Sequence, residues 1–225
     1  MSSDLAICDA LIKLYAWKGE PGWWDQGDMG QGDHGICWAA RRGDDGVTDI
    51  YLRGSVTPLD WFRDFLAAAY QPFGHNLMGP VHAGFYIGMP ETWAQMKRCL
   101  DPPFRVSGHS LGAGRAAILT GLMLLDKISE IERRVCFGEP RPGFAKLGQL
   151  IAPVPTASYR NGDTFHHDYI TDVPFELRPL LPYVHPVPLI MVNAPPGSAG
   201  PQEYGVFAWH HMPLYELALS HASTT

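Results

Sequence analysis

Residues 105–114 read R-V-S-G-H-S-L-G-A-G and contain a G-x-S-x-G motif at 108–112, with Ser110 at its centre. A short β-type segment, 104–107, precedes the motif, and a long apolar segment, 110–126, follows it. This order predicts a strand, a sharp turn at the serine and a buried helix. Glycines on both sides of the serine allow the strand and the helix to approach closely. The turn would present the Ser110 hydroxyl at the end of a sheet.

Strand and helix patterns alternate after about residue 90, which predicts an α/β sheet with helices on both faces. The expected helices are 4–17, 59–70, 91–100, 110–126 and 213–223. The expected strands are 35–41, 47–52, 104–107, 133–137, 156–160 and 188–193, the first two forming a hairpin around Asp45-Gly46. The expected loops are 19–34, 71–84 and 161–188. No composition shift divides the chain, so residues 1–225 are expected to form one domain.

Composition excludes several classes of protein. The 225 residues are 46% hydrophobic and 18% charged, enough for one core, which argues against a disordered chain. The net charge is −6 without a basic run, so we expect no nucleic-acid partner. The four cysteines are far apart and are expected to be free thiols. The N-terminal segment lacks the pattern of a signal peptide, which gives a cytoplasmic location as the default expectation.

A serine in such a turn is typical of a nucleophile, which needs a histidine base and an acid that orients the base. With this strand–turn–helix motif the expected chain order is serine, acid, histidine. Loop residues supply three candidate acids and two candidate bases in that order, namely Asp163, Asp168, Asp172, His210 and His211. The N–H of Leu111 begins the expected helix, where the helix dipole favours negative charge.

Five blocks of sequence resemble the class 3 lipase family, the fungal-type branch of the α/β-hydrolases. They read Y-L-R-G-S at 51–55, V-H-A-G-F at 81–85, G-H-S-L-G at 108–112, F-G-E-P-R-P-G at 137–143 and D-Y-I-T-D-V-P at 168–174. They occur in the family's order within about residues 35–220, and Pro142 replaces the family's usual valine. The resemblance implies an α/β-hydrolase fold, with a mostly parallel central sheet flanked by helices on both faces.

The resemblance also implies the roles of the site residues. Ser110 is the implied nucleophile, and Ser55 together with the N–H of Leu111 is the implied oxyanion hole. Spacing to the proline at 174 selects Asp168 as the acid, and the alternatives stay in the order Asp163, then Asp172.

The catalytic histidine lies shortly before a terminal helix in this family. A tyrosine five residues further along the chain selects His210, and His211 is the alternative. Adjacent histidines at 166–167 lack the spacing of zinc ligands, so no metal is expected.

The implied function is hydrolysis of carboxylic esters, acyl esters or acylglycerols, through an acyl-serine intermediate and without a cofactor. The alternatives are an acyltransferase or thioesterase with the same triad, and a non-catalytic binding relative. The expected partners are an acyl ester or lipid substrate and, transiently, a lipid interface. Segment 58–69, with Trp61, Phe62 and Phe65, is a candidate lid helix over an acyl groove, or else a fixed surface helix. The oligomeric state is not predicted.

Overall fold

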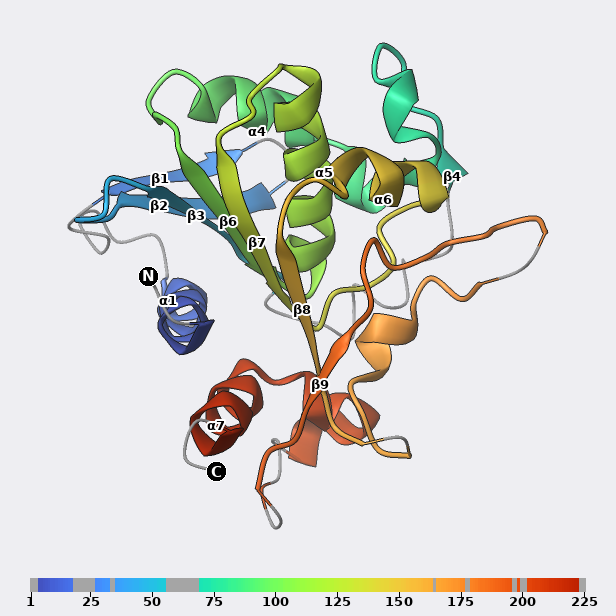
Figure 1. Ribbon diagram of the computed structural model, residues 1–225. Coiled ribbons are helices and arrows are strands. Elements are labelled where there is room, and N and C mark those ends of the chain that lie inside the picture. Colours follow the sequence, from blue (N-terminus) through green and yellow to red (C-terminus); the bar gives the residue numbers. More distant parts are fainter. Residues whose placement is uncertain are drawn as a thin grey trace.

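The computed structural model describes residues 4–17, 27–32, 35–55, 69–163, 165–176, 179–195, 198 and 202–222. Its central feature is a seven-stranded sheet with the order β1-β2-β3-β6-β7-β8-β9 (Figure 1). Strand β2 is antiparallel to both of its neighbours, and every pair from β3 to β9 is parallel. This agrees with the expected mostly parallel sheet.

The strands of this sheet are β1 (Gly27–Gly32), β2 (Ile36–Arg42), β3 (Thr48–Leu52), β6 (Phe104–His109), β7 (Ile131–Phe137), β8 (Thr156–Asn161) and β9 (Ile190–Val192). A separate two-stranded sheet contains β4 (Ala69–Tyr70) and β5 (Val81–His82). The α-helices are α1 (Asp4–Ala16), α3 (Ala83–Tyr86), α4 (Met89–Met96), α5 (Leu111–Leu125), α6 (Ala145–Ile151) and α7 (Met212–Ala222). Among the described residues, the 3₁₀ segments include η2 (Asn76–Met78), η3 (Tyr169–Asp172) and η4 (Gln202–His210).

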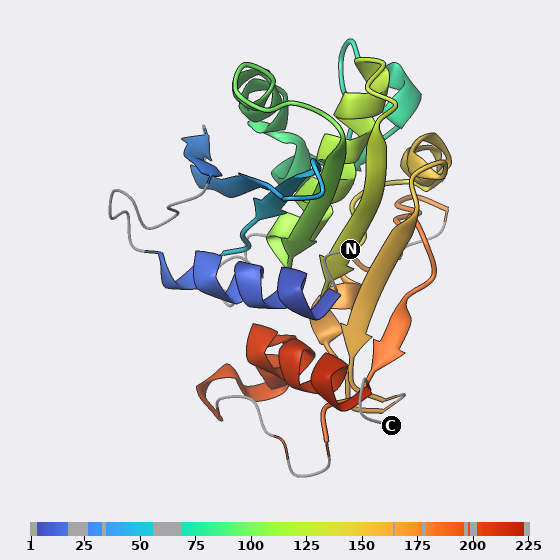
Figure 2. The same cartoon turned by 60° about the vertical axis from the view of Figure 1, so that its left-hand side comes forward.

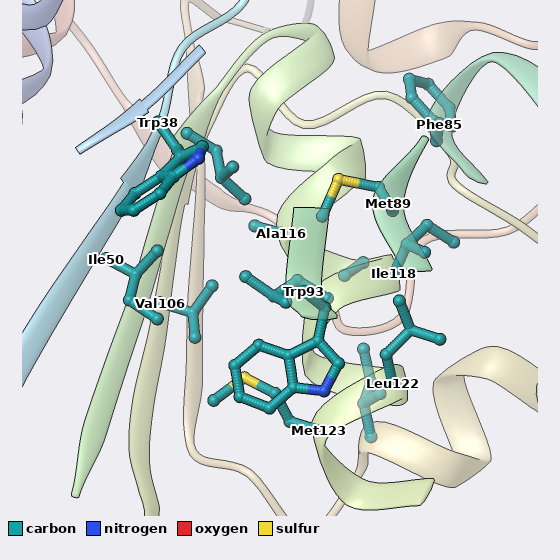
Figure 3. Packing of buried hydrophobic residues seen from close by; sticks show 14 of the residues in the cluster. Trp38, Ile50, Phe85, Met89, Trp93, Val106, Ala116, Ile118, Leu122 and Met123 are labelled. Carbon is teal, nitrogen blue, oxygen red and sulfur yellow. The ribbon is translucent and has the colours of Figure 1, made fainter. Parts of the chain in front are cut away.

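Helices cover both faces of the central sheet. Helices α1 and α7 lie side by side on one face, and α3 to α6 lie on the other (Figures 1 and 2). Side chains of β7 alternate between the two cores, since Val135 and Phe137 face α1 and α7 while Cys136 faces α5. Figure 3 shows the larger core, in which Trp93 packs against the α5 side chains.

Helix α5 is buried along almost its whole length. It therefore needs no polar face, which explains why its sequence is apolar on nearly every side. This burial gives the turn at its N-terminus a rigid support.

Most of the expected elements are confirmed, including the strand–turn–helix unit and the hairpin of β2 and β3. Residues 27–32 were expected in a loop, but they form β1 by pairing with β2. Ala69–Tyr70 were expected to end a helix, but they pair with β5. The helix expected at 91–100 is α4, which begins earlier and ends at Met96. Helix α6 was not predicted, because its seven residues are too few to show a helical period.

The four cysteines are free, as expected: Cys8, Cys37 and Cys136 are buried and Cys99 is exposed. None of the helices in the described ranges is long and apolar enough to cross a membrane.

Candidate active site

Ser110 lies in a strained turn between β6 and α5. Its φ of 59° and ψ of −130° are unfavourable for a residue with a side chain. The flanking glycines are required by packing, because a Cβ on Gly108 would lie 2.3 Å from Gly112 O and one on Gly112 would lie 2.1 Å from Leu52 O. The serine N–H donates to Phe137 O at 3.0 Å, which ties the turn to β7. The local sequence thus forces Ser110 into the conformation of a nucleophile elbow.

Asp168 and His210 form a buried pair, with 2.7 Å between Asp168 Oδ2 and His210 Nδ1. Their side chains are 0% and 3% exposed, respectively. The other carboxylate oxygen, Oδ1, accepts the Ile170 N–H at 3.0 Å and so caps η3. Because Nδ1–H donates to Asp168, Nε2 of a neutral His210 is the unprotonated nitrogen.

Tyr215 is a second donor to Asp168 Oδ2, with its hydroxyl 2.5 Å from that oxygen. Burial and the neighbouring carboxylate raise the pKa of Tyr215 well above its ordinary value, so the phenol keeps its proton. Its oxygen also accepts the Asn161 N–H at 3.2 Å. Tyr215 therefore joins the acid to β8 and α7.

His210 lies against the elbow through His109, the residue before the nucleophile. The two imidazole rings are stacked with 4.5 Å between their centroids, and His109 Nε2 is 2.9 Å from the backbone oxygen of His210. His210 Nε2 is buried and has no hydrogen-bond partner within the described ranges. Ser110 Oγ therefore makes no hydrogen bond to this nitrogen in the structure, and such bonds often tighten only in the complex with substrate.

The alternative acids and histidine lie elsewhere. Exposed Asp163 accepts the N–H groups of Phe165 and His166, both at 2.7 Å, and forms a turn. Asp172 pairs with Arg160 at 3.1 Å and with His167 at 2.9 Å. The N–H of His211 donates to Ala208 O at 3.2 Å, at the start of α7. Of the candidates, the structure brings together only Asp168 and His210.

The loop expected to carry an oxyanion donor lies directly beside Ser110. A Cβ on Gly54 would be 2.7 Å from Ser110 Cβ, so the backbone before Ser55 packs against the serine. Ser55 itself is half-buried. Leu111 follows Ser110 directly as the first residue of α5, and its N–H has no acceptor within the helix.

Sequence reasoning did not identify Gly138 or the hydroxyl of Tyr15 as parts of the site. Gly138 follows β7 with a φ of +56°, and a Cβ there would lie 2.6 Å from Asp168 Oδ2 and 2.8 Å from His210 Nδ1. The only sequence signal for Gly138 was its place in the 137–143 block. Tyr15 lies in α1, 39 positions before the Gly54 that it contacts, and no local pattern marks it.

Two further expectations concern the lid and metals. Trp61, Phe62 and Phe65 of the candidate lid lie outside the described residues. In the part of the chain that the structure describes, no three His, Cys, Asp or Glu side chains gather as they would around a metal ion.

A strained serine after a parallel strand, a buried histidine–aspartate pair and the chain order serine, acid, histidine define a serine hydrolase of the α/β-hydrolase class. The sequence pattern of the family Lipase (class 3) matches residues 50–178, more than half of the chain. The chain belongs to this family, and it is a carboxylic ester hydrolase.

Solved structures of fungal lipases share the fold. The triacylglyceride lipase of Rhizomucor miehei is 19% identical with a TM-score of 0.62, over 85% of this chain and 79% of that one. Lipase II of Rhizopus niveus is 17% identical with a TM-score of 0.59, over 86% and 81%. A triacylglycerol lipase whose catalytic centre is a serine protease triad is 20% identical with a TM-score of 0.58, over 76% and 74%. Among curated proteins, none matches the sequence.

Proposed function

We propose that this enzyme hydrolyses acyl esters, acylglycerols among them, with Ser110 as nucleophile, His210 as base and Asp168 as the acid that orients His210. The observation that carries the proposal is the buried 2.7 Å contact between Asp168 Oδ2 and His210 Nδ1, next to the strained serine. That contact fixes the tautomer with a free Nε2, the state in which a histidine acts as a base.

The reaction proceeds in two halves. His210 Nε2 removes the Ser110 proton while Oγ attacks the ester carbonyl carbon, which gives a tetrahedral oxyanion. The oxyanion collapses, the C–O bond to the alcohol breaks, and the alcohol leaves with the proton from His210. Water then attacks the acyl-serine with the same base, and the carboxylic acid leaves as Ser110 regains its proton.

The backbone donors at Ser55 and Leu111 are proposed to stabilise both oxyanions. Their placement next to Ser110, one in the loop after β3 and one at the N-terminus of α5, supports this role. Loss of one such donor typically lowers the rate by on the order of 10²–10³.

Acylglycerols are proposed as substrates because the chain is a class 3 lipase and because triacylglycerol lipases share its fold. For such a substrate, transient contact with a lipid interface follows from the low solubility of the ester. No observation favours transfer of the acyl group to another acceptor over hydrolysis.

The test is initial-rate hydrolysis of p-nitrophenyl esters from acetate to palmitate, and of emulsified triacylglycerol, beside Ser110→Ala. We expect wild-type turnover on medium or long chains and on the emulsion, with none in the variant. Turnover restricted to short soluble esters would contradict the acylglycerol proposal. Capture of most of the acyl group by an added alcohol would contradict hydrolysis as the reaction.

A further inference from the structure

The Tyr15 hydroxyl contacts two segments of the candidate site and is linked through His109 to a third. Its oxygen accepts the Gly54 N–H at 3.0 Å, in the loop that leads to Ser55. The same hydroxyl lies 2.8 Å from His109 Nδ1, beside the nucleophile. The far nitrogen of His109 lies 2.9 Å from the backbone oxygen of His210. A continuous series of hydrogen bonds thus runs from residues 53–55, which we call the oxyanion loop, through Tyr15 and His109 to the backbone oxygen of His210.

The groups at the two ends of the series determine which atom donates and which accepts in each hydrogen bond. The backbone oxygen of His210 only accepts, so His109 Nε2 carries a hydrogen. Burial, first, and the neighbouring His210 lower the pKa of His109 well below its ordinary value, so the ring is neutral and Nδ1 is an acceptor. The Tyr15 hydroxyl therefore donates to Nδ1 while it accepts from Gly54. Along these three contacts, each donor then has one acceptor.

The residue that follows α1 holds the oxyanion loop at a second point. Arg53 Nη1 donates to the backbone oxygen of Trp17 at 3.3 Å, just beyond the end of α1. The Arg53 N–H donates to Cys37 O at 3.0 Å, which joins the loop to β2. Gly54, by contrast, has its N–H on a side chain, so the position of the backbone before Ser55 depends on the Tyr15 hydroxyl.

We infer that Tyr15 is a positioning residue for ester hydrolysis, which sets the oxyanion loop and, through His109, the backbone of His210 relative to Ser110. It touches no reacting atom in this role. The inference rests on the proposed function, and it assigns to α1 a task in the chemistry besides its packing on α7.

The test compares Tyr15→Phe with Tyr159→Phe. Each variant removes one hydroxyl and keeps the ring. The Tyr159 hydroxyl also contacts α1, but it donates to Asp4 at the opposite end of that helix from Tyr15. We expect Tyr15→Phe to lower kcat about tenfold or more with KM changed less than twofold, because a misplaced donor affects the transition state more than the bound substrate. Tyr159→Phe should keep the wild-type kcat.

A second readout separates this inference from the proposed function. The rate of covalent labelling by a fluorophosphonate should fall in Tyr15→Phe by a similar factor, since phosphonylation also develops an oxyanion. Because labelling needs no ester, this readout is informative even when the tested esters do not include the natural substrate. The double variant Tyr15→Phe/His109→Gln should lose less than the product of the two single losses, because both residues act in one series. Equal kcat for the two tyrosine variants, a loss confined to KM, or a loss that only follows a lower melting temperature would each overturn the inference.

Discussion

A methyl group on Gly138 would lie 2.6 Å from Asp168 Oδ2, so the absence of a side chain after β7 makes room for the acid. The same methyl group would lie 2.8 Å from His210 Nδ1. Gly138 thus permits the contact between Asp168 and His210, and it does so with a φ of +56° that disfavours other residues.

Gly138→Ala should therefore lower kcat on the order of 100-fold, since displacement of a catalytic group by about 1 Å has effects of that size. The control is Gly46→Ala, because Gly46 also has a positive φ, +77°, but nothing lies within 4 Å of its Cβ position. The control should lose about 1–2 kcal/mol of stability and no activity. Equal activity in the two variants would show that the collision at Gly138 does not matter.

Asp168→Asn should abolish most activity, with kcat lower by about 10⁴, because an amide does not hold the required tautomer of His210.

Tyr215→Phe should have a smaller effect on kcat, less than about tenfold, since Asp168 keeps its contact with His210. Its free energy of unfolding should fall by about 1–3 kcal/mol, because the buried Asn161 N–H loses its acceptor.

Tyr183→Phe is the control for the effect of Tyr215→Phe on stability. The Tyr183 hydroxyl is buried without a hydrogen-bond partner in the described part of the chain, so its removal should be neutral or stabilising. Urea unfolding of both variants measures the difference. A larger loss in Tyr183→Phe than in Tyr215→Phe would contradict the assigned hydrogen bonds.

The ion pair between Arg134 and Glu139 is completely buried, and Glu139 Oε2 also accepts the Ser158 hydroxyl at 2.7 Å. Arg134→Met should cost about 3–5 kcal/mol of stability, because Glu139 would remain as an unpaired buried charge. The double variant Arg134→Met/Glu139→Leu should be more stable than that single variant. Chemical denaturation measures both values, and a double variant whose losses simply add would refute the explanation.

His82 should make the protein less stable as the pH falls. It is buried, burial lowers its pKa to about 4, and its Nδ1 accepts the Gly84 N–H at 3.1 Å. Below pH 6.5 the unfolded chain binds a proton that the folded chain excludes until about pH 4, so the free energy of unfolding falls in this window. The slope from one such group is up to about 1.4 kcal/mol per pH unit.

Unfolding curves between pH 4 and 7 for His82→Gln and His166→Gln test this contribution. The slope should become smaller in His82→Gln, because that variant no longer has the buried titrating group. His166, whose side chain is exposed, is the control for removal of a surface histidine. An unchanged slope in both variants would exclude a role for His82.

Local patterns were sufficient to predict the elbow, because its glycines and the apolar segments on each side lie within one short stretch. Spacing to Pro174 ranked Asp168 first, but local patterns did not exclude Asp163 and Asp172, which are close to it in one loop region. Only the three-dimensional path of the loop places Asp168 beside His210. Strand β1 was missed since its glycine-rich sequence has no alternating pattern, and its structure comes from pairing with β2.

The contribution of Tyr15 also lay beyond sequence patterns. By its spacing, Tyr15 falls on the apolar face of the amphipathic helix α1, like its neighbours on that face. Its hydroxyl acquires a role only because α1 packs so that its last turn reaches Gly54 and His109.

The central claim is that Ser110 is a nucleophile activated by His210 and Asp168. The most direct measurement is intact-mass spectrometry of the wild type, Ser110→Ala and Asp168→Asn after treatment with a fluorophosphonate, with peptide mapping of the adduct. The account predicts one adduct on Ser110 in the wild type, none in Ser110→Ala and much slower labelling in Asp168→Asn. An adduct of equal yield in Ser110→Ala, or an unlabelled wild type, would contradict it.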